Sequence, residues 1–190
     1  MVKGAVFLDR DGTINEEMGY INHPERFIIF PFVADSIKIF NNLKLLVIIV
    51  TNQSGVARGY FSESMVNQLH RKLVREMSKQ GAQIDDIYYC PHHPDEGDDH
   101  FRIDCECRKP KPGMILKAVE EHHIDLKQSY MIGDRYKDVV FAKKLKLKSG
   151  LVLTGYGKGE YTYQKKMWSE MPDFIGENLL DIAHIIESQI

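Results

Sequence analysis

The fold is decided by one short stretch of the sequence, Val6-Phe7-Leu8-Asp9-Arg10-Asp11-Gly12-Thr13. Its three apolar residues predict the end of a buried strand, and two carboxylates, a glycine and a threonine then follow abruptly. Asp9 and Asp11 are two positions apart, so in an extended chain both side chains point the same way. Gly12 lets the backbone turn sharply just beyond them. We therefore expect a pair of acids at the carboxyl end of a strand, where open α/β sheets bind their ligands.

This pair of acids suggests metal-dependent phosphoryl transfer. Two carboxylates held close together repel each other unless a cation or a proton lies between them, and for hard oxygen ligands the expected cation is Mg²⁺. Carboxylates can act as nucleophiles and form an aspartyl-phosphate. Asp9 comes first off the strand and is the expected nucleophile, whereas Asp11 is expected to protonate the leaving oxygen and then to activate water. The alternative is a strand end followed by a structural Asp-Gly turn.

Bulk composition indicates an ordinary globular protein. The chain has 190 residues, of which 43% are hydrophobic and 27% charged, and its formal net charge is −2. This length fits a single domain over residues 1–190. The absence of a long basic stretch or a long apolar run argues against nucleic-acid and membrane partners. The first strand begins almost at once, so we expect no signal peptide, and the predicted protein is a cytoplasmic monomer.

Strand and helix patterns alternate along the chain, which predicts a parallel sheet with helices on both faces. The expected strands cover residues 3–8, 45–50, 84–89, 129–132 and 149–153. The expected helices cover residues 33–43, 62–80, 113–122, 136–145 and 178–187. Residues 15–32 are expected to form a loop over the end of the first strand, and residues 158–174 match no clear pattern. The carboxyl ends of all the strands should meet at one edge of the sheet.

Polar side chains follow several of these expected strands. Asp134 follows the fourth strand, and Asp9, the main-chain carbonyl of Asp11 and Asp134 would give Mg²⁺ three oxygen ligands. The alternative role for Asp134 is to cap the helix that follows. The hydroxyl of Thr51 and the ammonium of Lys109 would bind phosphoryl oxygens. Together these groups provide the positioning and charge neutralisation that phosphoryl transfer requires.

The loop at residues 90–112 contains all three cysteines, in the pattern Cys-x-His, twelve residues, Cys-x-Cys. Four nitrogen and sulfur ligands in two close pairs fit a tetrahedral structural zinc, and the alternative is a flexible loop with three free thiols. His92 is favoured over His93 because its one-residue gap matches the cysteine pair. The other histidines, His70 among them, are expected in loops or on polar helix faces. The predicted zinc ligands are Cys90, His92, Cys105 and Cys107.

These motifs resemble those of the haloacid dehalogenase superfamily of phosphatases. The motifs that carry the resemblance are Asp9-x-Asp11-Gly12-Thr13, Thr51, Lys109 and Gly133-Asp134-x-x-x-Asp138. The cysteine and histidine set, followed by the run Arg108 to Gly113, resembles a narrower group within the superfamily. That group contains the D-glycero-D-manno-heptose 1,7-bisphosphate phosphatases and the histidinol-phosphate phosphatases. The run Thr51 to Gly55 and the pair Gly19-Tyr20 are similar to the heptose enzymes.

The resemblance implies a Rossmann-like three-layer fold with a mostly parallel sheet and no large cap domain. It also implies an Mg²⁺-dependent aspartyl-phosphate mechanism, a structural Zn²⁺ beside the site, and removal of the 7-phosphate from a heptose bisphosphate destined for surface polysaccharide. Asp9, Asp11, Thr51 and Lys109 would be catalytic. Arg108 would recognise the distal part of this small phosphorylated sugar. The remaining substrate contacts would come from Gly19, Tyr20, Asn52, Gln53, Ser54 and Arg135.

Other functions remain open at this level. A histidinol-phosphate phosphatase would share the catalytic groups, and Glu16 and Glu17 could bind its cationic amine, although Arg108 suits a second anionic group better. A 3′-phosphatase acting on nucleic acid ends is disfavoured by the lack of a basic track. A zinc-stabilised binding module without turnover would not need its acids.

Overall fold

The computed structural model describes residues 3–189. Its strands form one parallel sheet in the order β3-β2-β1-β4-β5-β6. This confirms the predicted α/β architecture, and within the described residues there is no large cap domain. The strands are β1 (Ala5–Leu8), β2 (Leu46–Asn52), β3 (Asp86–Cys90), β4 (Tyr130–Gly133), β5 (Lys148–Val152) and β6 (Phe174–Gly176).

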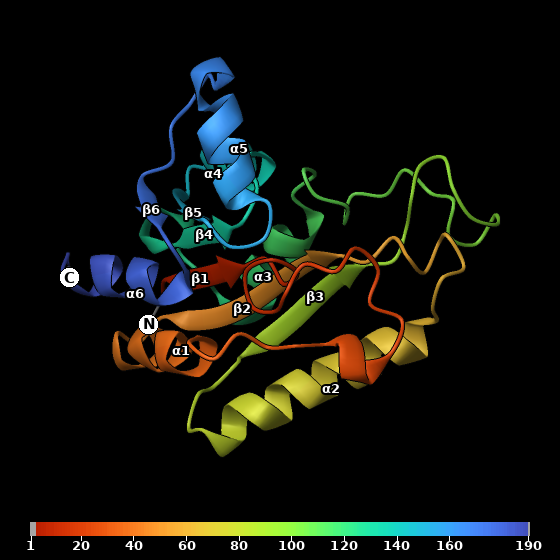
Figure 1. Cartoon of the computed structure of the whole chain (residues 1–190), viewed down its shortest axis with the longest axis horizontal. Coiled ribbons are helices and arrows are strands. Elements are labelled where there is room, and N and C mark those ends of the chain that lie inside the picture. The colour runs from red at the N-terminus through yellow and green to blue at the C-terminus, as the bar shows by residue number, and fades with distance from the viewer. Residues whose placement is uncertain (1–2, 190) are drawn as a thin grey trace.

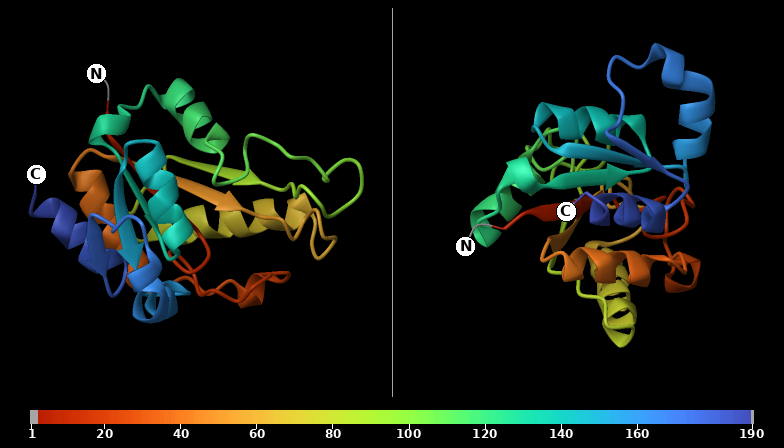
Figure 2. Two further views of the ribbon diagram at one scale, coloured as in Figure 1. Left: turned by 90° about the horizontal axis from the view of Figure 1, so that it is seen from above. Right: turned by 90° about the vertical axis from the view of Figure 1, so that its left-hand side faces the viewer.

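Helices cover both faces of the sheet, which gives the molecule three layers (Figures 1 and 2). Helices α1 (Val33–Asn42), α2 (Glu63–Lys79) and α6 (Leu179–Glu187) pack on one face. Helices α3 (Gly113–His122) and α4 (Tyr136–Lys144) pack on the other. Side chains of β2 alternate between these two cores, so the strand reads as a continuous apolar run. None of the described helices is long and apolar enough to cross a bilayer.

Helix α2 illustrates how local signals set the bounds of an element. The side chain of Ser62 accepts a hydrogen bond from the Met65 N–H and so caps the first turn. The helix ends just before Gly81, whose φ of 75° favours glycine. Its inner face is apolar at helical spacing and packs against the sheet. The buried residues of this face are Val66, Leu69, His70, Leu73 and Met77.

The carboxyl-terminal third contains a strand that the sequence did not predict. Residues 158–174, which match no clear pattern, contribute to α5 (Gly157–Gln164), to a 3₁₀ turn at Lys165–Met167 and to the start of β6. The polar helix α5 buries only Gly157, so it lacks the apolar stripe that identifies a helix. Strand β6 has three residues and is too short for a periodic signal. The sheet therefore has six strands instead of the expected five.

The strand order fixes where a ligand can bind. The chain runs from β1 outward to β2 and β3, and then returns to pair β4 with the other side of β1. In such sheets the crevice at the carboxyl ends, where the order reverses, is the binding site. The residues that directly follow β1 and β4 therefore decide the chemistry of the site.

Candidate active site

Three buried carboxylates meet at this reversal point. Asp9 follows β1, and its N–H donates to the carbonyl of Ile132 in β4 at 2.9 Å. Asp134 follows β4, and Asp138 lies in the first turn of α4. An oxygen from each of these three side chains lies within 4.8 Å of the other two. The structure thus brings Asp9 and Asp134 together, as expected, and adds Asp138 to the cluster.

Gly12 allows this close approach. Its φ is 83°, a left-handed conformation that favours glycine. A Cβ at this position would collide with the carboxylate of Asp134. The loop after β1 can therefore pass directly against the acid that follows β4.

The chemistry of this cluster fits a divalent cation. Burial and the neighbouring Asp9 raise the pKa of Asp134 to about 8. Burial also raises the pKa of Asp9. The Oδ2 atom of Asp138 is buried and has no hydrogen-bond partner. Crowded hard oxygen atoms with an unsatisfied acceptor among them match the preferences of Mg²⁺.

Lys109 partly neutralises these acids. Its Nζ lies 3.0 Å from Asp9 Oδ1 and 2.9 Å from Asp138 Oδ1, and its side chain is 4% exposed. Burial lowers the pKa of Lys109, but the two carboxylates outweigh this and raise it above its usual value, so the amine stays protonated. Asn52 exchanges two 3.0 Å hydrogen bonds with the Lys109 backbone, which ties the 90–112 loop to β2.

Replacing Lys109 with methionine is expected to destabilise the protein by about 3 kcal/mol, because it leaves buried carboxylates without their partner. The same variant should gain more thermal stability from added Mg²⁺ than the parent, since the cation would replace the missing positive charge. Thermal unfolding with and without Mg²⁺ measures both effects. Lys111→Met removes a half-buried lysine that lies outside the acid cluster and pairs with Asp104, and it is the matched control. Equal Mg²⁺ responses in all three proteins would contradict this account of the cluster.

Asp11 is held by a set of donors behind the cluster. Arg10 is 1% exposed, and its Nη2 lies 2.9 and 2.8 Å from the two carboxylate oxygens. Asn15 and Gln53 each donate one further hydrogen bond to the carboxylate. Burial raises the pKa of Asp11, but Arg10 and these donors outweigh burial and hold it below its usual value. Its side chain thus faces Arg10, and metal binding through its main-chain carbonyl stays a prediction.

His70 contacts Arg10 and is buried, and the expectation that His70 lies in a loop or on a polar helix face was therefore wrong. It is buried on α2, and its Nε2 lies 3.2 Å from Arg10 Nη1. Burial and the arginine lower the pKa of His70 to about 3, so the ring is neutral and can accept this hydrogen bond. Position 70 lies one turn from Val66 and shares its inner face, and this helical spacing was the available signal.

A pocket of about 270 Å³ opens above the acids. Most of the predicted substrate residues line it, but Gln53 lies beneath it, because its side chain donates to Thr51 and Asp11. Glu17, which was considered only for the histidinol-phosphate alternative, also lines the pocket, and Lys137 and Tyr156 line it without having been predicted to do so. Tyr156 follows β5, so its strand end was the available signal. The predicted residues in the lining are Asp9, Asp11, Gly19, Tyr20, Thr51, Asn52, Ser54, Arg108, Lys109, Asp134 and Arg135.

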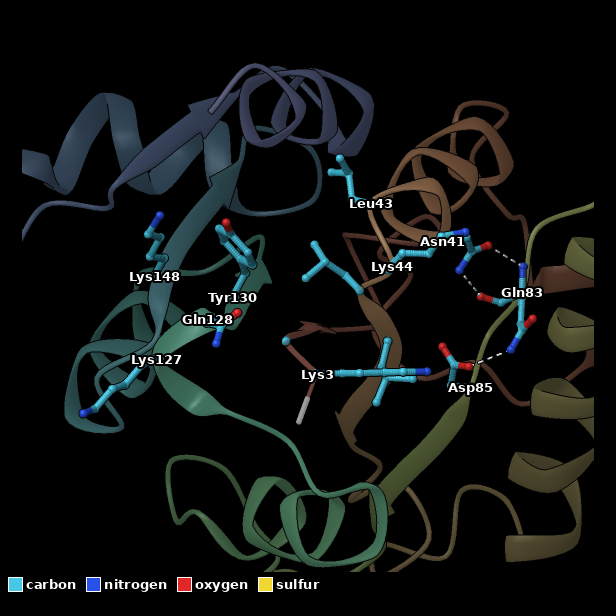
Figure 3. Close-up of a pocket in the computed structure, with 13 residues that line it drawn as sticks. Lys3, Asn41, Leu43, Lys44, Gln83, Asp85, Lys127, Gln128, Tyr130 and Lys148 are labelled. Atoms are coloured by element: carbon cyan, nitrogen blue, oxygen red, sulfur yellow. Dashed lines mark hydrogen bonds between the residues drawn. The ribbon is translucent and has the colours of Figure 1, made fainter. Parts of the chain in front are cut away.

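A larger hollow, of about 860 Å³, lies at the opposite end of the sheet (Figure 3). Its lining includes four lysines, and Asp85, its one carboxylate, binds the Val47 N–H and the Gln83 side chain. The hollow contains none of the clustered acids, so size does not identify the reactive site.

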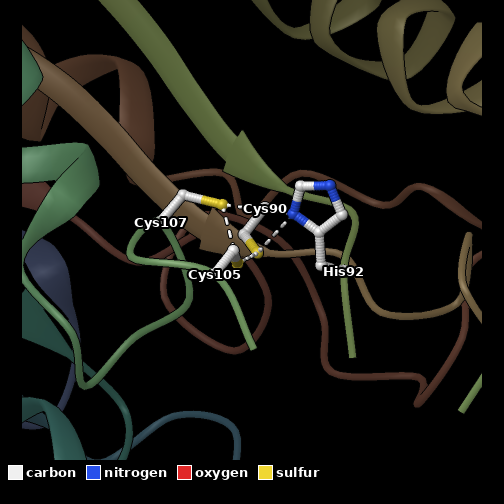
Figure 4. Close-up of side chains that lie close together, drawn as sticks. All are labelled: Cys90, His92, Cys105 and Cys107. Atoms are coloured by element: carbon white, nitrogen blue, oxygen red, sulfur yellow. Dashed lines mark hydrogen bonds between the residues drawn. The ribbon is translucent and has the colours of Figure 1, made fainter. Parts of the chain in front are cut away.

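The four predicted zinc ligands converge at the end of β3 (Figure 4). The sulfur of Cys105 lies 3.4 Å from that of Cys90 and 3.1 Å from that of Cys107, too far for a disulfide of about 2.05 Å. His92 Nδ1 lies 3.8 and 3.4 Å from the sulfurs of Cys90 and Cys107. This two-pair donor set fits tetrahedral zinc. His93 instead contacts Arg58, at 3.1 Å.

Comparison with known proteins agrees with this geometry. A family model described as HAD-hydrolase-like matches residues 106–182. The solved structure of a D,D-heptose 1,7-bisphosphate phosphatase from B. bronchiseptica, complexed with magnesium and phosphate, superposes with a TM-score of 0.84 at 29% identity and covers 98% of this chain and 99% of that chain. The fold and the site thus define a HAD-like phosphatase, a class that hydrolyses phosphoric monoesters and uses Mg²⁺.

Two curated relatives narrow the assignment. Both are named D-glycero-beta-D-manno-heptose-1,7-bisphosphate 7-phosphatase. The protein from Pasteurella multocida is 41% identical over 183 residues, which is 92% of this chain and 97% of that protein. The protein from Haemophilus influenzae is 37% identical over 189 residues, or 96% of each chain. The chain belongs to this family of HAD-like heptose bisphosphate phosphatases.

Proposed function

We propose that this protein removes the 7-phosphate of D-glycero-D-manno-heptose 1,7-bisphosphate with Mg²⁺, within a single domain over residues 1–190. The observation that carries the proposal is the contact of Lys109 with Asp9 beneath a pocket that also contains Arg108 and Arg135. This arrangement offers a nucleophile and a cation to the reacting phosphate, and further cations to a second one. The high identity to the curated relatives supports the same substrate.

The reaction has two balanced steps. A carboxylate oxygen of Asp9 attacks phosphorus, and the bond from phosphorus to the O7 atom of the sugar breaks. Arg10 and the neighbouring donors keep Asp11 ionised in the free protein, so Asp11 takes up a proton when substrate binds and then gives that proton to the departing oxygen. Water then attacks the phosphorus of the aspartyl-phosphate, Asp11 takes its proton, and phosphate leaves with Asp9 restored. Arg10, Asn15 and Gln53 hold the carboxylate of Asp11 between these steps. Lys109 and the hydroxyl of Thr51 stabilise the charge on the phosphoryl oxygens.

Two metals would complete the site. Asp9 and Asp134, with the main-chain carbonyl of Asp11, would hold Mg²⁺, which when bound neutralises carboxylate and phosphoryl charge. Asp138 would support them through Lys109. Zn²⁺ held by the three cysteines and His92 would order the loop that carries Arg108 and Lys109. We expect the enzyme to be a cytoplasmic monomer.

The comparisons give no support to the histidinol-phosphate alternative. Glu17 lines the pocket and could bind an amine, but three cations that line the same pocket, Arg108, Arg135 and Lys137, favour a second anionic group. A 3′-phosphatase acting on nucleic acid ends has no support either, because the names of the relatives described above give a heptose bisphosphate as the substrate. The paired acids argue against a binding module without turnover.

Substrate preference tests this proposal. We expect kcat/KM for heptose bisphosphate, measured as phosphate release with Mg²⁺, to exceed that for histidinol phosphate by at least about a hundredfold, since a substrate without the second phosphate leaves Arg108 and Arg135 of the pocket without an anionic ligand. Both anomers of the bisphosphate should be compared, and chelation of Mg²⁺ should abolish turnover of each. A preference for histidinol phosphate would refute the assignment.

A further inference from the structure

The segment that the sequence could not place is anchored beside the active-site pocket. The ring of Trp168 stacks on that of Tyr136, with centroids 4.4 Å apart and planes within 4°. The hydroxyl oxygen of Tyr136 also accepts hydrogen bonds from the N–H groups of Ser169 and Glu170, at 3.0 and 3.2 Å. Helix α5, at the start of this segment, lies next to α4 (Figure 1). The segment is therefore fixed next to Arg135 at the pocket rim.

Glu160 projects from this segment and uses both carboxylate oxygens. Its Oε1 accepts a hydrogen bond from Arg135 Nε at 3.0 Å, and its Oε2 accepts one from the Tyr136 N–H at 2.7 Å. The side chain is only 12% exposed. The second bond ties the carboxylate to the first turn of α4, so Glu160 is itself held in place when it binds Arg135.

Arg135 is held from a second direction as well. Its guanidinium carbon lies 4.4 Å from the centre of the Tyr156 ring. The Tyr156 N–H in turn donates to Asp134 Oδ2 at 2.9 Å. Both the edge and the face of the guanidinium are thereby fixed relative to the acid cluster. Among residues 3–189, no acceptor is bonded to its two terminal nitrogens, and these form the fork that binds phosphate.

We infer that Glu160 is a positioning residue that aims Arg135 at the phosphate that is not cleaved, and that it thereby sets the preference for bisphosphates over monophosphates. This inference rests on the proposed function. The expected change in anion binding on loss of the Glu160 charge is opposite to the change that electrostatics alone would give. Removing the negative charge of Glu160 makes the rim more positive, which by itself would tighten binding of an anion. Loss of the fixed orientation of Arg135 should instead weaken binding of the phosphate, because a mobile arginine must be ordered when the phosphate binds.

The test compares Glu160→Gln with Glu170→Gln, an exposed acid of the same segment. The substrates are heptose 1,7-bisphosphate and heptose 7-phosphate, which lacks the distal phosphate. Glu160→Gln is expected to raise KM for the bisphosphate about fivefold to tenfold, with kcat within about twofold of the parent. KM for the monophosphate should not change. The control Glu170→Gln should match the parent on both substrates.

A double-mutant cycle with Arg135→Met shows whether the effect acts through the arginine. Once Arg135 is removed, Glu160→Gln is expected to have no further effect on KM for the bisphosphate. A parent-like or lower KM in Glu160→Gln would overturn the inference, and so would an equal rise for both substrates. In those cases the proposed function would stand, because the parent still hydrolyses the bisphosphate. A parent that does not hydrolyse it would overturn both.

Discussion

Replacing Asp9 with asparagine is expected to lower kcat by about a thousandfold or more, because no other group of the site can replace the nucleophile. Asparagine has the same shape and relieves repulsion within the acid cluster. Lys109 keeps its contact with Asp138 in this variant. The protein should therefore fold at least as stably as the parent, and the lost activity would reflect chemistry alone. Steady-state phosphate release and thermal unfolding measure the two effects on the same samples.

Asp95→Asn is the matched control for this substitution, because Asp95 is exposed in the 90–112 loop. It should retain parental kinetics. If Asp9→Asn retained activity comparable to the parent, the assignment of the nucleophile would be falsified. A large fall in melting temperature would show instead that Asp9 has mainly a structural role.

Replacing His92 with asparagine is expected to produce the second large effect. The loop at residues 90–112 has little core of its own. Structural zinc binds to zinc-finger peptides with a free energy of about 10–16 kcal/mol, and this binding energy stabilises the folded form. Losing one ligand should empty the site or weaken it by orders of magnitude. Because Lys109 reaches Asp9 from this loop, activity should fall together with metal content. Zinc analysis by mass spectrometry and thermal unfolding, with kcat measured in parallel, provide the readouts.

His93→Asn is the control, since His93 is adjacent in sequence but contacts Arg58 instead of the sulfur cluster. It should keep one zinc per chain and parental stability. Parent-like zinc content in His92→Asn would contradict the proposed ligand set. Equal loss of zinc in both variants would indicate that the loop tolerates no change, whichever residue binds the metal.

Most of the fold could be predicted because its signals are local. Apolar runs marked the buried strands, and Ser62 and Gly81 marked the ends of α2. The proximity of Asp9 and Asp134 could be predicted because the carboxyl ends of all parallel strands lie at one edge of the sheet. The zinc ligands could be chosen from spacing alone, and the structure gathers the same four residues.

Tertiary packing decided the features that the sequence did not reveal. Gln53 belongs to the same polar run as the pocket residues Asn52 and Ser54, yet its side chain turns inward to Asp11. The spacing of His70 along α2 could have indicated its burial, but its contact with Arg10 joins two distant parts of the chain. Glu160 acts on Arg135 across 25 positions, from a helix without an apolar stripe. Such long-range polar contacts leave no periodic signal.

The central claim is that Asp9 becomes phosphorylated during turnover. The most direct measurement uses the Asp11→Asn variant, which lacks the base of the second step and also the acid of the first, so it is incubated with substrate long enough for the slowly formed phosphoenzyme to accumulate. Heptose bisphosphate and Mg²⁺ are mixed with this variant, the reaction is trapped with borohydride, and the peptides are analysed by mass spectrometry. We expect homoserine at position 9, formed only when substrate is present. Release of phosphate while Asp9 stays unmodified would contradict the account, and so would homoserine at another aspartate.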